Sequence, residues 1–204
     1  PQENLEIFFK GDFEEKHMGS LKELGSYAMK TAVAVRGKEE PEPYRVSTFC
    51  FKDGNGLYLI LAYKGKEDKE FFEELLESLS YTGIGGKRSA GFGRFEAVER
   101  KMPESLRKKL TDTGKMNILL STALPQKQQL EKVLEEATYT LIRRGGFIDS
   151  QNLKDGPKRK KDIYVFAPGS CFKTTFSGQV EEEETGGEHS VFRYEKALFL
   201  GVNL

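Results

Sequence analysis

The chain has 204 residues, of which 37% are apolar and 31% carry a formal charge. Its 32 Lys and Arg balance its 32 Asp and Glu, so the formal net charge is zero and does not by itself call for a nucleic-acid partner. Because no apolar run approaches the length of a membrane span, we expect a charge-rich globular protein of one large domain or two small ones.

The two cysteines, Cys50 and Cys171, are too few for a disulfide framework, and neither has a metal-ligand partner at a suitable spacing. We therefore expect small buried thiols in a reducing cytoplasm and no metal site. Residues 158–161 (KRKK) form a basic run and residues 181–184 (EEEE) an acidic one, and both are predicted to be solvated loops.

The first predicted element is a β-hairpin. Residues 44–51 alternate and are rich in β-forming side chains, residues 53–56 (DGNG) give a strong turn signal, and residues 57–63 are apolar again. This order predicts two antiparallel strands joined by the turn.

A helix is predicted over residues 66–80, with Asp68 as the cap at its start. The apolar side chains that recur on one face of this helix are Phe71, Phe72, Leu75, Leu76 and Leu79. A glycine-rich loop over residues 82–95 follows directly, and residues 95–98 are predicted to form a short strand.

The second half repeats this mixture of strands and a helix. An amphipathic helix is predicted over residues 126–144 and ends at Gly145. Strands are predicted around it over residues 116–124, 162–166, 172–182 and 191–202. Residues 183–190 are the expected exposed connection between the last two strands.

These elements predict an α+β fold, because strands and helices are mixed and many connections are hairpins. Two tandem ferredoxin-like (RRM-like) units, each a small antiparallel sheet with helices on one face, account for the order. We expect the first domain over residues 1–112 and the second over residues 113–204. The first lacks the opening strand and helix of such a unit. Because the chain starts at Pro1 without an initiator methionine, we expect a leading segment to be missing.

The glycine-rich loop, TGIGGKRSAGFGRF, does not match the common nucleotide-binding motifs. A Walker A loop fails because Gly86 and Lys87 are followed by Arg88. A dinucleotide fingerprint fails because Arg88 replaces its third glycine and the loop runs from helix to strand. The match to the RNP1 motif of RNA-recognition strands is weak, because Ala90 stands where a cation is expected, and this argues against a general RNA-recognition domain.

The residue types of the loop nevertheless suit binding of a phosphate chain. Glycines allow close approach of the backbone, and successive amides form anion-binding nests. Lys87 and Arg88 add charge, Ser89 adds a neutral donor, and no catalytic base lies nearby, which favours holding a phosphodiester chain over cutting it. A tight helix-to-strand turn in which Lys87 and Arg88 face water is the alternative that the sequence leaves open.

The loop follows a longer pattern of glycines. Gly-hydrophobic-Gly at residues 83–85, five residues that include a cation at 86–90, and Gly-hydrophobic-Gly at 91–93 fill every position of the glycine-rich loop of RAMP proteins from CRISPR systems, which the chain therefore resembles. Further blocks in the same order are similar to the family of the fourth Csm subunit of type III-A effector complexes. These blocks are residues 42–49, 117–123, 143–147 and 191–197.

The resemblance implies a subunit without catalytic residues, metal or cofactor that acts in the prokaryotic cytoplasm in antiviral defence. It implies binding of the five-prime, repeat-derived tag of the CRISPR RNA (crRNA). It also implies two protein partners: the large signature subunit with cyclase and nuclease domains, docked at the foot of the complex, and the backbone RAMP subunit of the Csm complex.

The resemblance also implies which residues contact the RNA. Residues 29–45 resemble the thumb-like hairpin of the family, which inserts near the tag and splays a base. The implied RNA-binding residues are Lys30, Tyr44 and Arg45 from this hairpin and Gly85, Gly86, Lys87, Arg88, Ser89, Gly91 and Phe92 from the loop. The hairpin residues are equally compatible with an ordinary strand surface. Phe92 is expected to stack on a base or to pack beneath the loop.

The alternative function is a RAMP-family, metal-independent endoribonuclease that processes CRISPR repeat RNA, usually with a histidine as general base. Only His17 and His189 are available, and the acidic surroundings of His189 would raise its pKa and favour the cation. Carboxylates occur on helix faces and in a loop run rather than as an isolated pair. We therefore expect binding without catalysis.

Overall fold

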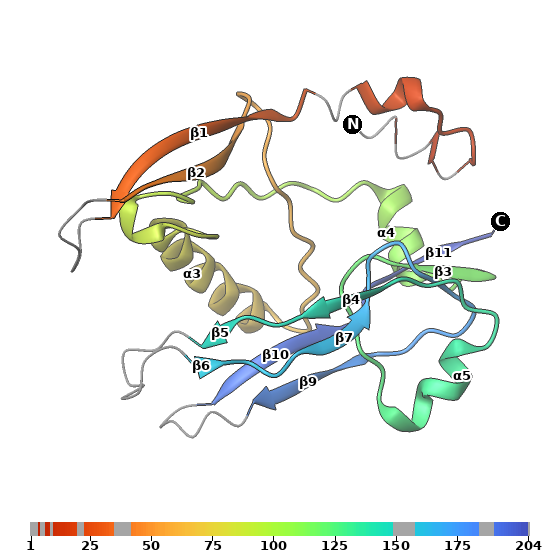
Figure 1. Cartoon of the computed structure of the whole chain (residues 1–204). Helices are drawn as coiled ribbons and strands as arrows, with labels where there is room; N and C mark the ends of the chain where they lie inside the picture. The colour runs from red at the N-terminus through yellow and green to blue at the C-terminus, as the bar shows by residue number, and fades with distance from the viewer. Residues whose placement is uncertain are drawn as a thin grey trace. The chain divides into compact units, whose positions relative to one another are not determined.

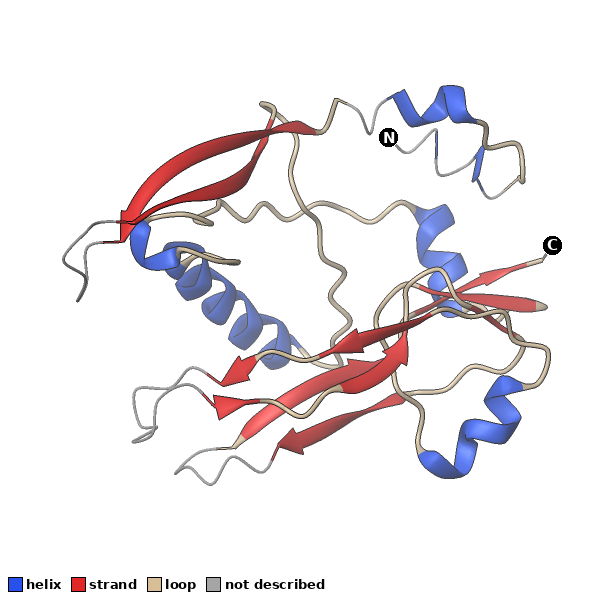
Figure 2. Cartoon of the chain, viewed as in Figure 1, coloured by secondary structure: helices blue, strands red, loops and turns tan. Residues whose placement is uncertain are grey.

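Figure 1 shows the chain as a computed structural model. The structure describes residues 4, 7–8, 10–19, 23–34, 42–148, 158–183 and 190–203. The chain divides into two compact units, Pro1–Glu99 and Arg100–Leu204, so the division falls before the boundary expected after residue 112. Helices and small antiparallel sheets are mixed throughout (Figure 2), and among the described residues no helix combines the length and apolar character needed to cross a membrane.

The first unit is built around one long hairpin. A short 3-10 helix, η1 (Glu15–Met18), precedes strand β1 (Gly25–Ala34), which pairs antiparallel with β2 (Glu42–Phe51). The register runs from Gly25 opposite Phe51 to Ala34 opposite Glu42. The structure thus has a hairpin where the resemblance implied a thumb-like one, and residues 35–41 lie outside the described residues.

The hairpin predicted between residues 44–51 and 57–63 is wrong, because β2 pairs with β1 and residues 57–63 are irregular. Figure 2 shows the whole connection from β2 to α3 as loop. The predicted turn does form, with the Asn55 amide donating to the Lys52 carbonyl at 3.0 Å. However, the Asn55 side chain donates to the carbonyls of Glu23 and Leu24, at 3.0 and 3.2 Å. These bonds connect the turn to the two residues that precede β1.

Helix α3 (Lys66–Thr82) confirms the predicted helix. Its cap is Gly65 rather than Asp68, whose carboxylate instead accepts hydrogen bonds from the backbone amides of Lys64 and Gly65 at 3.3 Å each. Its apolar face stays largely open, since Phe71 is 63% exposed. The strand predicted over residues 95–98 is absent, and the chain there is irregular.

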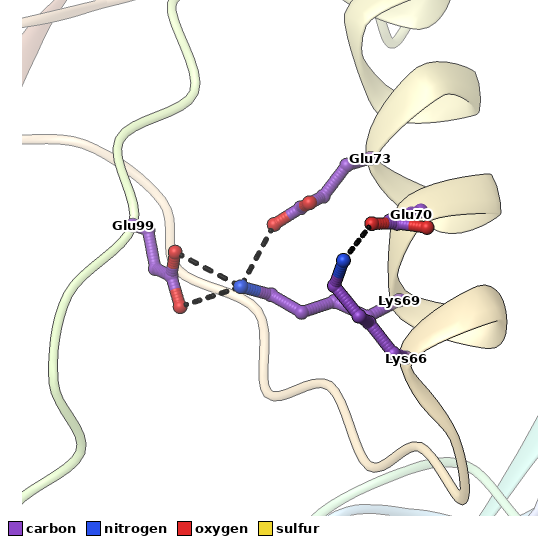
Figure 3. Close-up of polar contacts among 5 residues, drawn as sticks. All are labelled: Lys66, Lys69, Glu70, Glu73 and Glu99. Carbon is purple, nitrogen blue, oxygen red and sulfur yellow. Dashed lines mark hydrogen bonds and ion pairs between the residues drawn. The ribbon is translucent and has the colours of Figure 1, made fainter.

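Lysines of α3 make several ion pairs, shown in Figure 3. Lys66 pairs with Glu70 at 2.9 Å and Lys69 pairs with Glu73 at 3.2 Å, each one turn along the helix. Lys69 also reaches Glu99 at 3.1 Å, from the chain that follows the glycine loop. The hydrogen bonds that the Lys69 ammonium donates to Glu99 and then to Glu73 raise the pKa of Lys69 above its ordinary value of 10.5.

The second unit contains the buried core. Helix α4 (Glu104–Thr111) leads into a three-stranded antiparallel sheet in the order β11–β3–β8, where β3 is Met116–Leu119, β8 is Cys171–Phe172 and β11 is Phe199–Val202. Burial removes apolar surface from water, which stabilises the fold by about 1.5–3 kcal/mol for each large side chain. The core side chains are Leu119, Ala123, Val133, Phe166, Phe172 and Phe176.

Three further strand pairs belong to this unit. β4 (Leu141–Arg144) pairs with β7 (Ile163–Phe166), β5 (Phe147–Ile148) with β6 (Lys158–Arg159), and β9 (Gly178–Glu183) with β10 (Val191–Lys196). All three pairs are antiparallel. The basic and acidic runs therefore enter strands β6 and β9 instead of forming only loops.

The helix predicted over residues 126–144 is mostly wrong. It is reduced to a 3-10 turn, η3 (Lys127–Gln129), and the short helix α5 (Leu130–Leu134). Glu136 has a left-handed φ of 53°, and Thr138 then bridges Cys171, so the chain leaves the helix and becomes strand β4. Pairing with the sheet outweighs the helix propensity of this segment, because tertiary contacts commonly override intrinsic propensity.

The long strands predicted in the second unit are interrupted. Residues 116–124 form only β3, although Ala123 bridges Phe166. Residues 172–182 divide into β8 and β9, and residues 191–202 divide into β10 and β11. β10 pairs with β9 whereas β11 pairs with β3, so the last segment changes sheet between its halves. The connection at residues 183–190 lies almost wholly outside the described residues.

The expectation that both cysteines are buried is wrong for Cys50. Cys50 is exposed, and Cys171 is half-buried. Cys50 lies on a two-stranded hairpin, opposite Ser26, and a sheet of two strands covers little of its own side chains.

Candidate nucleic-acid interface

The glycine-rich loop leaves α3 through Gly83, whose amide donates to the Leu79 carbonyl at 2.7 Å. At the base of the loop, the amide of Ile84 donates to the carbonyl of Gly93 at 2.9 Å, which holds the two ends together. A short 3-10 turn, η2 (Arg88–Ala90), forms the tip between them. The loop is therefore a closed, hydrogen-bonded turn with an exposed end.

The glycines of this loop divide into two groups. At the base, a Cβ on Gly93 would lie 1.9 Å from the Ile84 carbonyl oxygen, and one on Gly83 would lie 2.7 Å from that of Phe92, so the fold itself requires both glycines. At the tip, a Cβ on Gly85, Gly86 or Gly91 would have no atom within 4 Å. The tip glycines thus leave the backbone open to a neighbour outside the chain.

The glycine loop and the β1–β2 hairpin meet through two cation–aromatic contacts. The Lys87 ammonium donates a hydrogen bond to the Tyr44 hydroxyl at 2.9 Å and lies 4.6 Å from the centre of its ring. The Lys30 ammonium lies 5.1 Å from the centre of the Phe92 ring. Four of the residues predicted from the sequence are therefore gathered at one place.

The strand register explains which hairpin residues reach the loop. Lys30 is opposite Val46 and Tyr44 is opposite Ala32, so Lys30 and Tyr44 project from the same face of the hairpin. Arg45 is opposite Thr31 and projects from the other face. The structure thus separates Arg45 from Lys30 and Tyr44, with which the sequence analysis grouped it.

Accessibility separates the roles of the loop side chains. Lys87, Arg88 and Ser89 are exposed, whereas Phe92 is half-buried. Phe92 therefore fits the expectation of an aromatic packed against the loop better than that of a freely exposed stacking ring. Among the described residues, the Arg88 side chain makes no hydrogen bond or ion pair, so its charge is available to an external anion.

The residues considered for catalysis are not brought together. His17 lies in η1, where its Nδ1 accepts a hydrogen bond from the Glu14 amide at 2.9 Å. His189 lies outside the described residues. In the part of the chain that the structure describes, no group of three or more His, Cys, Asp and Glu is placed to hold a metal ion.

An open depression of about 510 Å³ in the second unit offers few groups for acid–base chemistry. Among the described residues that line it, Asp112 is the one ionisable residue, and Asn117, Gln129 and Phe176 are among the neutral ones. General acid–base catalysis needs a group with a suitable pKa next to the reacting atoms, and usually a second to orient it or to return the proton.

Sequence reasoning missed one group of exposed residues in the second unit. The pairs β4–β7 and β5–β6 bring Arg143, Phe147, Arg159 and Tyr164 to neighbouring positions. The signal available was the combination of the block at residues 143–147 with the basic run at 158–161. The sequence alone did not show that the two segments are linked through short strands.

Two family models match the chain. The model of the RAMP superfamily matches residues 5–96, and the model of the CRISPR Csm4 C-terminal domain matches residues 112–202. Each match lies wholly within one of the two compact units.

Curated relatives match nearly the whole chain. The protein from Mycobacterium tuberculosis named CRISPR system Cms protein Csm4 is 35% identical over 204 residues, covering 99% of this chain and 66% of the relative. The protein of the same name from Streptococcus thermophilus is 33% identical, covering 99% of this chain and 64% of the relative. The chain therefore spans just under two thirds of the length of these two relatives.

A solved structure shows the same fold. It is the crystal structure of a Csm3-Csm4 subcomplex in the type III-A CRISPR-Cas interference complex, with a TM-score of 0.55 and 22% identity over 94% of this chain and 62% of that chain. The two family models and the curated relatives show that the chain belongs to the RAMP superfamily. Within that superfamily it is a Csm4-like protein, which confirms the resemblance recognised in the sequence.

Proposed function

We propose that the chain is a non-catalytic subunit of a type III-A Csm interference complex and binds the five-prime tag of the crRNA. Its Csm4 relatives support membership of such a complex. The observation that carries RNA binding is the junction of the loop and the hairpin: Lys87 reaches Tyr44, Lys30 lies over Phe92, and the glycine tip is open.

The proposed binding mode follows from the chemistry of this junction. Lys87 and Arg88 contact phosphates of a single strand, and the open backbone at Gly85 and Gly86 lets the strand approach closely. Tyr44 offers a ring face on which a splayed base stacks. In this mode affinity comes from the backbone of the RNA, and none of the groups named acts as a base toward the 2′-hydroxyl.

The proposal extends to partners and fold. The backbone RAMP subunit is the partner suggested by the Csm3-Csm4 subcomplex that the fold resembles. We propose docking of the large subunit with cyclase and nuclease domains in the prokaryotic cytoplasm, as the sequence resemblance implies. The tandem ferredoxin-like arrangement, with domains over residues 1–112 and 113–204, belongs to the same proposal.

The first test replaces the two adjacent cations at the tip of the loop, Lys87 and Arg88. Lys87→Ala/Arg88→Ala is expected to weaken binding of tagged single-stranded crRNA by about tenfold at low salt, because two charged contacts are lost. The slope of log K against log salt should fall by about 0.7 for each lost phosphate contact. Fluorescence anisotropy of labelled RNA across a salt series measures both quantities.

The matched control removes two cations from exposed positions elsewhere in the same unit, Lys52→Ala/Lys64→Ala. This variant changes net charge equally but leaves the loop and its hairpin contacts intact. If it weakens binding as much as the loop variant does, or if the loop variant keeps the original affinity and salt slope, the glycine loop is not the tag-binding site.

A further inference from the structure

Two short strand pairs in the second unit place cations beside aromatic rings. Arg143 on β4 is opposite Tyr164 on β7, and Phe147 on β5 is opposite Arg159 on β6. Directly opposite residues of antiparallel strands project from the same face. The Lys160 amide donates to the Gly146 carbonyl at 2.8 Å, which continues the pairing between the two ladders.

A single carboxylate joins the two arginines. An Nη atom of Arg159 lies 2.9 Å from Asp162 Oδ2, and an Nη atom of Arg143 lies 3.7 Å from the same oxygen. A Cβ at Gly145 would lie 2.2 Å from Asp162 Oδ1, so the glycine makes room for this carboxylate. Two guanidinium groups share one carboxylate, so the cluster of Arg143, Arg159 and Asp162 keeps a net positive charge.

Buried contacts fix the backbone near Arg143 and Arg159. Arg193 is 6% exposed, and its guanidinium donates to the carbonyl of Arg144 at 3.1 Å and to the carbonyl of Lys161. Arg144 turns toward Thr122 and the fully buried Glu195, at 3.1 and 3.9 Å. Arg144 is therefore engaged with the unit itself, whereas Arg143 and Arg159 extend outward.

All four side chains of this surface are accessible. The side chains of Arg143 and Arg159 are 62% and 63% exposed, and Phe147 and Tyr164 are 67% and 62% exposed. Large exposed rings beside guanidinium groups are typical of surfaces that bind single-stranded nucleic acid, where bases stack on the rings and cations meet the phosphates. An acidic protein segment would use the charges but would leave both rings without a role.

We propose that Arg143, Phe147, Arg159 and Tyr164 form a second contact for single-stranded RNA, in the second unit of the chain. The proposal rests on the proposed function in that the bound strand is a guide RNA. In this proposal the four residues of the second unit bind nucleotides other than those that the glycine loop binds. The arginines hold phosphates and the two rings stack bases without selecting a sequence.

The test measures binding of single-stranded RNA, made of the tag and adjoining guide nucleotides, to the full 204-residue chain. Arg143→Gln/Arg159→Gln is expected to lower affinity and to flatten the salt slope by about 1.4, because each lost phosphate contact accounts for about 0.7. Phe147→Leu and Tyr164→Leu are each expected to lower affinity by about fivefold or more while leaving the salt slope unchanged, because they remove stacking alone. Thermal unfolding checks that each variant remains folded.

The matched control is Arg100→Gln/Arg107→Gln, which removes two exposed arginines from the same unit. Equal losses in this control and in Arg143→Gln/Arg159→Gln would overturn the proposal, because the effect would then be one of net charge. The proposal would also be overturned if Arg143→Gln/Arg159→Gln left RNA binding unchanged but abolished binding of a Glu-rich peptide. That result would point to an acidic protein partner.

The outcome is separable from that of the proposed function. If Lys87→Ala/Arg88→Ala weakens binding and the arginine and ring variants do not, the second-unit surface is rejected and the loop stands. If the arginine and ring variants weaken binding and the loop variant does not, this surface is supported and the loop is rejected.

Discussion

At the scale of single residues, one lysine of the glycine loop and one of the β1–β2 hairpin are positioned by aromatic side chains rather than by carboxylates. Lys87 rests on the ring and hydroxyl of Tyr44, and Lys30 rests on Phe92. A ring holds an ammonium group by the negative charge of its face and leaves its net charge intact. A carboxylate partner would instead neutralise the charge that a phosphate needs. This arrangement keeps both lysines positive toward an incoming strand.

The glycines at the base of the loop are required by the fold, whereas those at its tip are proposed to serve the bound RNA. Gly93→Ala is expected to destabilise the first unit more than Gly91→Ala. Both have φ near +80°, where alanine costs about 1–2 kcal/mol. Only at residue 93 would the new Cβ also meet backbone, 1.9 Å from the Ile84 carbonyl oxygen, which adds about 1–3 kcal/mol of overpacking. Chemical denaturation followed by circular dichroism measures the difference.

RNA affinity provides the second readout for this pair of variants. Gly91→Ala should weaken RNA binding by more than its small loss of stability explains, because its Cβ occupies open space at the tip. Equal unfolding free energies for the two variants would contradict the division of the loop into a structural base and an open tip.

At the scale of elements, local signals predicted α3 and the loop well. The helix has apolar residues at helical spacing and acidic residues in its first turn, and both act within a few residues of the chain. Residues of the candidate site could be named because their glycines and cations are adjacent in sequence. Their junction with the hairpin could not, because Lys87 and Tyr44 lie 43 positions apart and meet only through the fold.

The strands were harder to predict because a strand is defined by its partner. β1 reads GSYAMKTAVA, with small and polar residues that show little alternation, yet it pairs along its whole length with β2. Residues 57–63 have strong β-forming side chains but stay irregular, because β1 takes the pairing with β2. Thr138 likewise leaves a predicted helix once Cys171 supplies a strand partner.

The contact of α3 with the chain beyond the loop gives a prediction at the same scale. Lys69→Gln is expected to lower the stability of the first unit, because it removes the bonds to Glu73 and Glu99. The folded-state pKa of Lys69 lies above 10.5, so this stability is fully present below about 10.5 and is lost as pH rises through the raised value. The difference between wild type and variant should therefore be constant from mildly acidic to mildly alkaline pH and shrink only above about 10.5.

The matched control for this prediction is Lys66→Gln, which removes a lysine of the same helix whose one ion pair among the described residues is with Glu70, one turn along. Thermal unfolding at several pH values distinguishes the two variants. A difference that already disappears between neutral and mildly alkaline pH would show that the ammonium of Lys69 is not what ties Glu99 to the helix.

At the scale of the whole molecule, a net charge of zero conceals two basic surfaces, one in each unit. The first is the loop junction with Lys30, Lys87 and Arg88, and the second is the arginine pair of β4 and β6. Acidic residues gather elsewhere, along α3 and on β9. Such separation allows one chain to hold a polyanion on some faces and to meet a protein on others.

The whole chain is expected to bind repeat RNA without cutting it. His17 already accepts a hydrogen bond from the Glu14 amide through Nδ1, and Asp112 is the one ionisable residue among the described residues that line the open depression of the second unit. Incubation of labelled repeat RNA with the chain, analysed by denaturing gel electrophoresis, should leave the RNA intact. His17→Ala and His189→Ala should behave like wild type. Specific cleavage that either substitution abolishes would identify a general base and replace the binding function with a nuclease.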